Sequence, residues 1–175
     1  MIYILTALKS EAQAFVDKYK LKKKKINGYL IFSNETITII ISGIGIQKSI
    51  ESSLFLINNY QINANDTLIN VGICGACSKY KIGELLQIQA INYNGQNYKL
   101  HNCIKNTLTC IDYEAATDLY EIVDMESYGF YKILHPHNLY IFKVISDHFE
   151  PEKITKEGTK TLIFNTIDEM FKKVS

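Results

Sequence analysis

The stretch TLINVGICGA, residues 67–76, decides the fold class of this chain of 175 residues. Its first half, residues 67–71, is an apolar, β-branched run that predicts a buried strand, and the glycine-rich residues 72–76 are expected to end that strand in a turn. The same pair of signals occurs earlier, where the run 36–41 is followed by the glycine turn Ser42–Gly45. Because ligands bind at the carboxyl ends of strands in α/β sheets, we expect both turns at the ligand-binding edge.

The rest of the chain alternates apolar runs of strand length with segments of helical periodicity. The predicted strands cover residues 2–7, 29–32, 36–41, 67–71, 85–91, 107–111 and 140–145, and the predicted helices cover residues 10–20, 47–59, 125–134 and 160–173. We expect residues 29–32 and 36–41 to pair as a hairpin, and the polar stretch 92–106 to be an excursion or a short hairpin. This order predicts a single α/β domain over residues 1–175, a three-layer sandwich whose central, largely parallel or mixed β-sheet is flanked by helices.

Composition narrows the possible partners. The formal net charge is +1 and charged residues make up 21% of the chain, so neither nucleic acid nor a membrane is indicated. All 19 basic residues are lysines, and their densest run, Lys22–Lys25, is expected in a solvated loop. No apolar run approaches the roughly 20 residues that span a bilayer, and no secretory signal is visible. With only four cysteines, a reduced, cytoplasmic protein is the simplest interpretation.

Two acidic motifs occur near the C-terminus: VDMES at residues 123–127 and VISDH at residues 144–148. Each places a carboxyl group where a predicted element begins or ends. Taken alone, Glu126 also suits the positive end of a helix dipole, and Asp147 also suits a turn after a strand. One acid that holds sugar hydroxyls and one that gives up a proton are a plausible minimum for cleaving a glycosidic bond.

Five short motifs follow one another along the chain: TALKSE at 6–11, SGIG at 42–45, INVGICG at 69–75 with KIGE at 81–84, VDME at 123–126 and ISD at 145–147. Their order and spacing resemble the nucleoside phosphorylase/nucleosidase family, most closely its hydrolytic methylthioadenosine/S-adenosylhomocysteine nucleosidase branch. The resemblance spans nearly the whole chain. It implies the fold of that family, a purine nucleoside as substrate, and no cofactor or metal.

The resemblance also implies a role for each site residue. Asp147 is expected to be a neutral acid that protonates the purine base, Glu126 an anion that accepts hydrogen bonds from the ribose hydroxyls, and Glu11 the residue that positions the attacking water. A neutral Asp147 must be partly buried against apolar walls. The expected substrate-binding residues are Ile73, Cys74, Gly75, Met125, Glu126, Ser146 and Tyr113, with Tyr113 standing in for a missing aromatic contact to the base.

The chain departs from that family in one segment. It is shorter between the strands predicted at 85–91 and 107–111, so the polar residues 92–106 replace a region that carries part of the family's subunit interface and supplies aromatic residues to the pocket. The resemblance therefore implies a homodimer with an altered interface.

Four further points accompany this interpretation. Family members that are phosphorylases grip phosphate with arginine, which is absent here, so water attack is favoured over a phosphate-dependent purine nucleoside phosphorylase. The shortened segment also leaves open a catalytically silent nucleoside-binding module. Cys74 and Cys77 have CxxC spacing, but without a second such pair they are better explained by packing than by zinc or redox chemistry. His148 either orients Asp147 or ends its strand.

Overall fold

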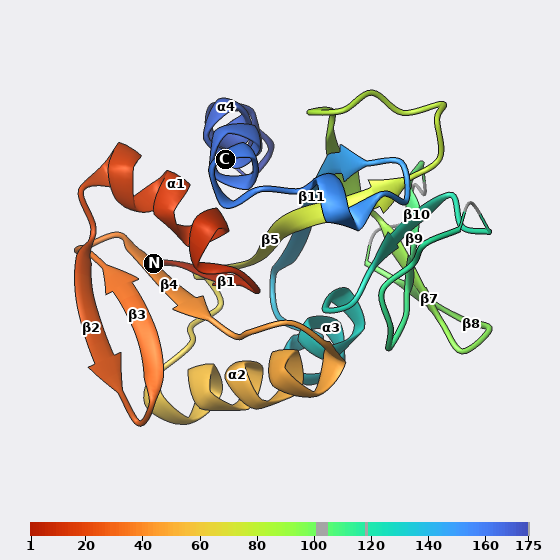
Figure 1. Ribbon diagram of the computed structural model, residues 1–175. Coiled ribbons are helices and arrows are strands. Elements are labelled where there is room, and N and C mark those ends of the chain that lie inside the picture. Colours follow the sequence, from red (N-terminus) through yellow and green to blue (C-terminus); the bar gives the residue numbers. More distant parts are fainter. Residues whose placement is uncertain (101–104, 118, 175) are drawn as a thin grey trace.

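The computed structural model describes residues 1–100, 105–117 and 119–174, and they form one mixed β-sheet with helices on both faces (Figure 1). The strands are β1 (Ile2–Thr6), β2 (Lys22–Ile26), β3 (Tyr29–Ser33), β4 (Ile37–Ile41), β5 (Thr67–Ala76), β6 (Leu85–Ile88), β7 (Ala90–Tyr93), β8 (Gln96–Lys99), β9 (Thr107–Cys110), β10 (Ile122–Asp124) and β11 (Leu139–Asp147). The helices are α1 (Lys9–Tyr19), α2 (Ile46–Asn59), α3 (Ser127–Leu134), the short 3-10 helix η1 (Pro151–Lys153) and α4 (Lys156–Val174).

Strand β5 is the axis of the sheet. It pairs in parallel with β1 along its first half, in parallel with β11 from Leu68 to Gly75, and antiparallel with β10 at its end. The main strand order is β2-β3-β4-β1-β5-β10-β9-β7-β8, and β11 also carries β6. The carboxyl ends of β1, β5 and β11 therefore open on the same edge of the sheet, as expected for a ligand site in an α/β fold.

The two faces of the sheet bury separate apolar cores. Helices α1 and α4 cover one face, where Phe15 and Ile163 are fully buried, and α2 and α3 cover the other, where Leu56 and Phe130 are fully buried (Figure 1). Gly129 allows α3 to approach α2 closely, because a Cβ at this position would lie 2.5 Å from the carbonyl oxygen of Ile46. The predicted three-layer α/β fold is confirmed.

Two predictions about the extent of the sheet are wrong. The lysine-rich segment predicted as a solvated loop is strand β2, an exposed edge strand that pairs with β3. A row of lysines suits an edge strand, because charged side chains prevent further strands from adding. The strand predicted to end at Val71 continues to Ala76, since Gly72 and Gly75 adopt the extended conformation beside β11 instead of forming a turn.

The segment 85–91 was expected to be one strand but forms two, β6 and β7, which pair with different neighbours. The polar stretch that follows contains the hairpin β7–β8, and its turn residues Asn94 and Gly95 have φ values of 51° and 77°. An Asn-Gly pair with positive φ is the preferred two-residue hairpin turn. Residues 101–104, including Cys103, lie outside the described part of the chain.

Tyrosine side chains pack the β7–β8 hairpin against α3. Tyr93 stacks on Tyr128 with ring centroids 4.1 Å apart, and Tyr98 contacts both Tyr128 and Tyr131. The shortened segment therefore has an ordered, aromatic contact with its own chain in its described part.

The helices lie close to their predicted places. Helix α3 begins at Ser127, two residues later than predicted, because β10 runs up to Asp124; α4 begins four residues earlier than predicted, at Lys156. Within the described ranges, no helix combines the length and the apolarity needed to cross a membrane.

Candidate active site

A cavity of about 300 Å³ lies at the carboxyl ends of β1, β5 and β11. Its lining includes every residue predicted from sequence to be catalytic or to bind the substrate: Glu11, Ile73, Cys74, Gly75, Tyr113, Met125, Glu126, Ser146 and Asp147. Its other lining residues are Ala7, Leu8, Ile44, Glu114, Ala115, Val123, Asp124, Pro151 and Ile154. The fold thus brings together three acids that are far apart in the sequence.

Glu11 enters the cavity from the first turn of α1 and is only 2% exposed. Its Oε2 accepts a hydrogen bond of 2.8 Å from the backbone N–H of Leu8, and its Oε1 accepts one of 3.0 Å from the N–H of Ile73 in β5. Burial raises the pKa of Glu11, and the two backbone donors oppose that rise. Both donors also fix the carboxyl group in one orientation between α1 and β5.

Glu126 lies at the junction between β10 and α3 and is 8% exposed. Its Oε1 accepts a hydrogen bond of 2.8 Å from the N–H of Gly45, at the N-terminus of α2. Burial, reinforced by the nearby Asp124 carboxylate, raises the pKa of Glu126 to about 7. Within the described residues no second hydrogen bond to this carboxyl is recorded, which leaves capacity for a ligand hydroxyl in the cavity.

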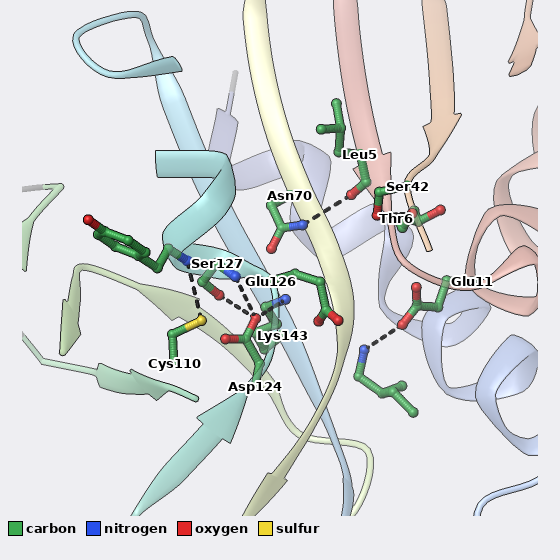
Figure 2. A network of polar contacts seen from close by, with 12 residues as sticks. Leu5, Thr6, Glu11, Ser42, Asn70, Cys110, Asp124, Glu126, Ser127 and Lys143 are labelled. Carbon is green, nitrogen blue, oxygen red and sulfur yellow. Dashed lines mark hydrogen bonds and ion pairs between the residues drawn. The ribbon is translucent and has the colours of Figure 1, made fainter. Parts of the chain in front are cut away.

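A buried ion pair supports this corner of the site, and no role for it is predicted from sequence. The ammonium group of Lys143, in β11, lies 2.7 Å from Asp124 Oδ2, and both side chains are 1% exposed. The same Asp124 oxygen accepts hydrogen bonds from the N–H and hydroxyl of Ser127. Figure 2 shows Asp124, Ser127 and Lys143 gathered beside Glu126.

Asp147 is aimed by an irregularity in β11. The register between β5 and β11 shifts between Ile145 and Asp147, so that Ser146 bulges out of the ladder. Asp147 Oδ1 accepts a hydrogen bond of 3.0 Å from the N–H of Glu150, and its Oδ2 lies 2.6 Å from the Ser146 hydroxyl. The intervening Phe149 has a φ of 63°, a strained conformation for a bulky side chain that turns the chain back toward the carboxyl group.

Two apolar side chains lie near the Asp147 carboxyl group at Gly75. A Cβ added to Gly75 would lie 3.4 Å from Val123 and 3.6 Å from Phe149. A Cβ added to Gly75 would lie 3.6 Å from Asp147 Oδ1, so this glycine leaves open the space in front of the carboxyl group. The remaining predicted residue, Tyr113, is 59% exposed at the mouth of the cavity, where its hydroxyl lies 2.6 Å from that of Tyr120.

The remaining groups that could take part in chemistry near the site are cysteine, histidine and lysine side chains. Cys74 and Cys77 are free thiols, and burial raises the pKa of Cys74. His148 lies with Nδ1 2.9 Å from the carbonyl oxygen of Ala76, which fits a role in ending the strand. Among the described residues, no three His, Cys, Asp or Glu side chains are arranged to hold a metal, and the lining of the cavity contains no basic residue.

No protein-family model matches the sequence, and no curated protein sequence matches it. Solved structures do match over nearly the full length of both chains. A 5′-methylthioadenosine/S-adenosylhomocysteine nucleosidase from Neisseria meningitidis, in complex with methylthio-immucillin-A, superposes with a TM-score of 0.80 at 14% identity and covers 98% of each chain. The nucleosidase from Colwellia psychrerythraea, in complex with adenine, gives a TM-score of 0.75 at 16% identity, covering 96% of this chain and 94% of that chain.

A third match is the corresponding Helicobacter pylori protein, an Asp-to-Asn variant with 5′-methylthioadenosine in its active site, with a TM-score of 0.76 at 13% identity and coverage of 96% of this chain and 98% of that chain. At such low identities these likenesses establish the fold and leave the activity to be argued from the site. The chain has the fold of the methylthioadenosine/S-adenosylhomocysteine nucleosidases, which confirms the resemblance at that level.

Proposed function

We propose that this protein is a purine nucleosidase that hydrolyses the N-glycosidic bond of a nucleoside of the methylthioadenosine/S-adenosylhomocysteine type. The observation that carries the proposal is the convergence of Glu11, Glu126 and Asp147 on one cavity. Nucleosidases with this fold bind adenine and nucleoside analogues, which supports the choice of substrate class.

Asp147 is the proposed acid toward the base. An N-glycosidic bond breaks when the purine leaves, and a proton or hydrogen bond delivered to a ring nitrogen makes the base a better leaving group. Asp147 lines the cavity, and Gly75 leaves room for a flat base to approach its carboxyl group.

Glu126 is the proposed ribose ligand. Its carboxylate is fixed by the N–H of Gly45, and its free hydrogen-bonding capacity lies toward the cavity. An anion at this point also stabilises the positive charge that develops on the ribose as the bond breaks. Met125, which lines the cavity next to it, supplies an apolar surface for the sugar.

Glu11 is the proposed residue that positions the attacking water. Two backbone N–H groups hold its oxygens, and each oxygen keeps one further lone pair that can accept a hydrogen from water. Burial raises its pKa, which makes the carboxylate a stronger base than an exposed glutamate.

The charge of the lining favours water over phosphate as the nucleophile. A phosphate dianion beside three acids needs cationic partners, yet the chain contains no arginine and the described lining contains no lysine. Hydrolysis is therefore the preferred reaction, and phosphorolysis is the alternative to be tested.

The test is base release from methylthioadenosine, S-adenosylhomocysteine, adenosine and inosine, followed by liquid chromatography with and without phosphate. We expect phosphate-independent release of adenine and a free reducing sugar. Strict dependence on phosphate with formation of a sugar 1-phosphate would establish a phosphorylase instead. Binding of adenosine analogues without base release over hours would leave only a nucleoside-binding module.

A homodimer with an altered contact at residues 92–106 is part of the proposal. It rests on the family resemblance alone, and the β7–β8 hairpin in this segment packs on α3 of its own chain. Light scattering of the purified protein, with the tyrosine contact broken by Tyr98→Ala, measures whether this hairpin contributes to association.

A further inference from the structure

Lys143 stands apart from the other lysines of the chain because it is fully buried. It lies in β11 between Phe142 and Val144, both of which are fully buried, and its own side chain is 1% exposed. An ammonium group in such surroundings is strongly destabilised unless anions compensate it. Asp124 supplies one anion at 2.7 Å, and this pairing alone would neutralise the lysine.

The lysine nevertheless reaches beyond Asp124, toward the site. Gly72, its partner across the strands, has no side chain, and the space of the missing Cβ is shared by Lys143 and Glu11. A Cβ there would lie 3.1 Å from Glu11 Oε1 and 3.3 Å from Lys143 Nζ. The ammonium group and the Glu11 carboxyl therefore meet over the same glycine.

Only one of the two carboxyl oxygens of Asp124 is paired. Its Oδ2 takes the ammonium group and both donors of Ser127, while its Oδ1 is buried and has no hydrogen-bond partner among the described residues. It also lies two residues from Glu126, whose pKa it raises, whereas Lys143 lowers that pKa. One cation thus acts on three acids.

We propose that Lys143 is a positioning residue of the reaction site, whose ammonium group, anchored by Asp124, is the shared cation that keeps Glu126 ionised for ribose binding. This inference rests on the proposed function for the identity of the ligand, but the control of Glu126 by Lys143 exists without any ligand. Lys143 acts through Glu126 and needs no contact with the substrate.

The groups that face Glu126 decide the direction of each effect. They are Asp124 on β10, Lys143 on β11, Glu11 on α1 and the backbone N–H of Gly45 at the start of α2. The thiols of Cys74 and Cys110 lie near Asp124, and burial raises the pKa of each, so they stay neutral. Removing the cation leaves like charges together and favours protonation of Glu126, whereas removing the Asp124 charge frees the cation to act on Glu126.

Two substitutions therefore have opposite expected effects. Lys143→Met gives an unbranched, uncharged side chain that is one atom shorter, and it should raise the pH midpoint of Glu126. Asp124→Asn keeps the shape of the partner without its charge and should lower that midpoint. Lys143→Arg preserves the cation and should leave the pH midpoint of Glu126 close to that of wild type. Lys132→Met, on the exposed face of α3, is the matched control.

The direct measurement is a ¹³C titration of the glutamate carboxyl groups in the ligand-free protein, with the Glu126 signal assigned by its loss in Glu126→Gln. We expect shifts of about one pH unit or more, upward in Lys143→Met and downward in Asp124→Asn. A purely structural role for Lys143 would not produce the upward shift in Lys143→Met, and the downward shift in Asp124→Asn checks that the titration responds to a charge at this position. A midpoint in Lys143→Met that stays within about 0.3 units of wild type, or that moves downward, overturns the proposal. If Lys143→Met does not fold, Lys143→Gln, which is also uncharged, is titrated in its place and is judged by the same two outcomes.

A second measurement links this control to the ligand. The dissociation constants of adenine and of a non-hydrolysable methylthioadenosine analogue are compared over pH 5–9. Because adenine lacks ribose, Lys143→Met should weaken binding of the analogue about tenfold near pH 7.5 and that of adenine less than about twofold. Equal weakening for both ligands contradicts the proposed role. If wild type binds neither ligand while the carboxyl shifts are as expected, the proposed function fails and the control by Lys143 stands.

Discussion

Glu126→Gln is expected to make the protein more stable at neutral and alkaline pH while removing its proposed ribose ligand. The pKa of Glu126 is raised from 4.5 to about 7 in the folded state, chiefly because the carboxyl group is buried. Between these two values the folded protein holds a proton that the unfolded chain has lost. The free energy of unfolding therefore falls as the pH rises through this window and is level again above it.

The magnitude follows from the size of the shift. A displacement of roughly 2.5 pH units corresponds to about 3 kcal/mol at about 1.4 kcal/mol per unit. Glutamine carries no charge, accepts the same hydrogen bond from Gly45 and avoids this loss. We expect Glu126→Gln to match wild type near pH 4.5 and to exceed its stability by about 3 kcal/mol above pH 7.

Urea denaturation followed by circular dichroism, at pH 4.5 and pH 8, measures this difference. The exposed Glu35 supplies the matched control, since Glu35→Gln makes the same chemical change in solvent and should leave the pH dependence of wild type intact. A gain below about 1 kcal/mol at pH 8, or the same gain at both pH values, would refute the assignment of this burial cost to Glu126.

Three further substitutions test the site and the packing. Asp147→Asn should reduce base release by about 100-fold or more while binding of adenine persists, as measured by chromatography and calorimetry; an active variant would refute the acid role. Glu11→Gln should lower the rate of base release by a similar factor with little change in nucleoside affinity, and a loss confined to affinity would contradict it. Gly129→Ala should destabilise the fold by about 2 kcal/mol or more in urea, because its Cβ would lie 2.5 Å from the Ile46 carbonyl; Gly158→Ala, in the first turn of α4, is the control.

Hydrophobic periodicity predicted most of the fold. It failed for an exposed edge strand and for glycines that lie within an extended strand. The run Lys22–Lys25 has the composition of a loop, yet an edge strand is exposed in the same way, so composition alone does not separate the two. Gly72 and Gly75 were expected to form a turn, but in β5 they remove side chains where Glu11, Lys143 and Asp147 come close to the strand. This role of the two glycines cannot be predicted from the local sequence, because it depends on contacts between segments that are distant in the chain.

In the candidate site, too, residues in local motifs were predicted and a residue that depends on distant contacts was not. Motif order predicted which residues line the cavity, because each motif places its residues at the end of a strand or the start of a helix. Lys143 gave no signal, since one lysine in an apolar strand is normally an exposed residue. Its burial depends on Asp124, which reaches it from β10, and on the space left by Gly72.

The bulge at Ser146 sets the hydrogen bonds of Asp147. Asp147 Oδ1 accepts the N–H of Glu150 and Glu126 Oε1 accepts the N–H of Gly45, so each carboxyl group has one backbone donor. The two acids differ in their second contact, because only Asp147 lies beside a hydroxyl group. The Ser146 hydroxyl has one hydrogen and lies 3.1 Å from the Cys74 carbonyl oxygen and 2.6 Å from Asp147 Oδ2. The bulge therefore ties the Asp147 carboxyl to the backbone of β5 at Cys74, which orients the proposed acid toward the cavity that both residues line.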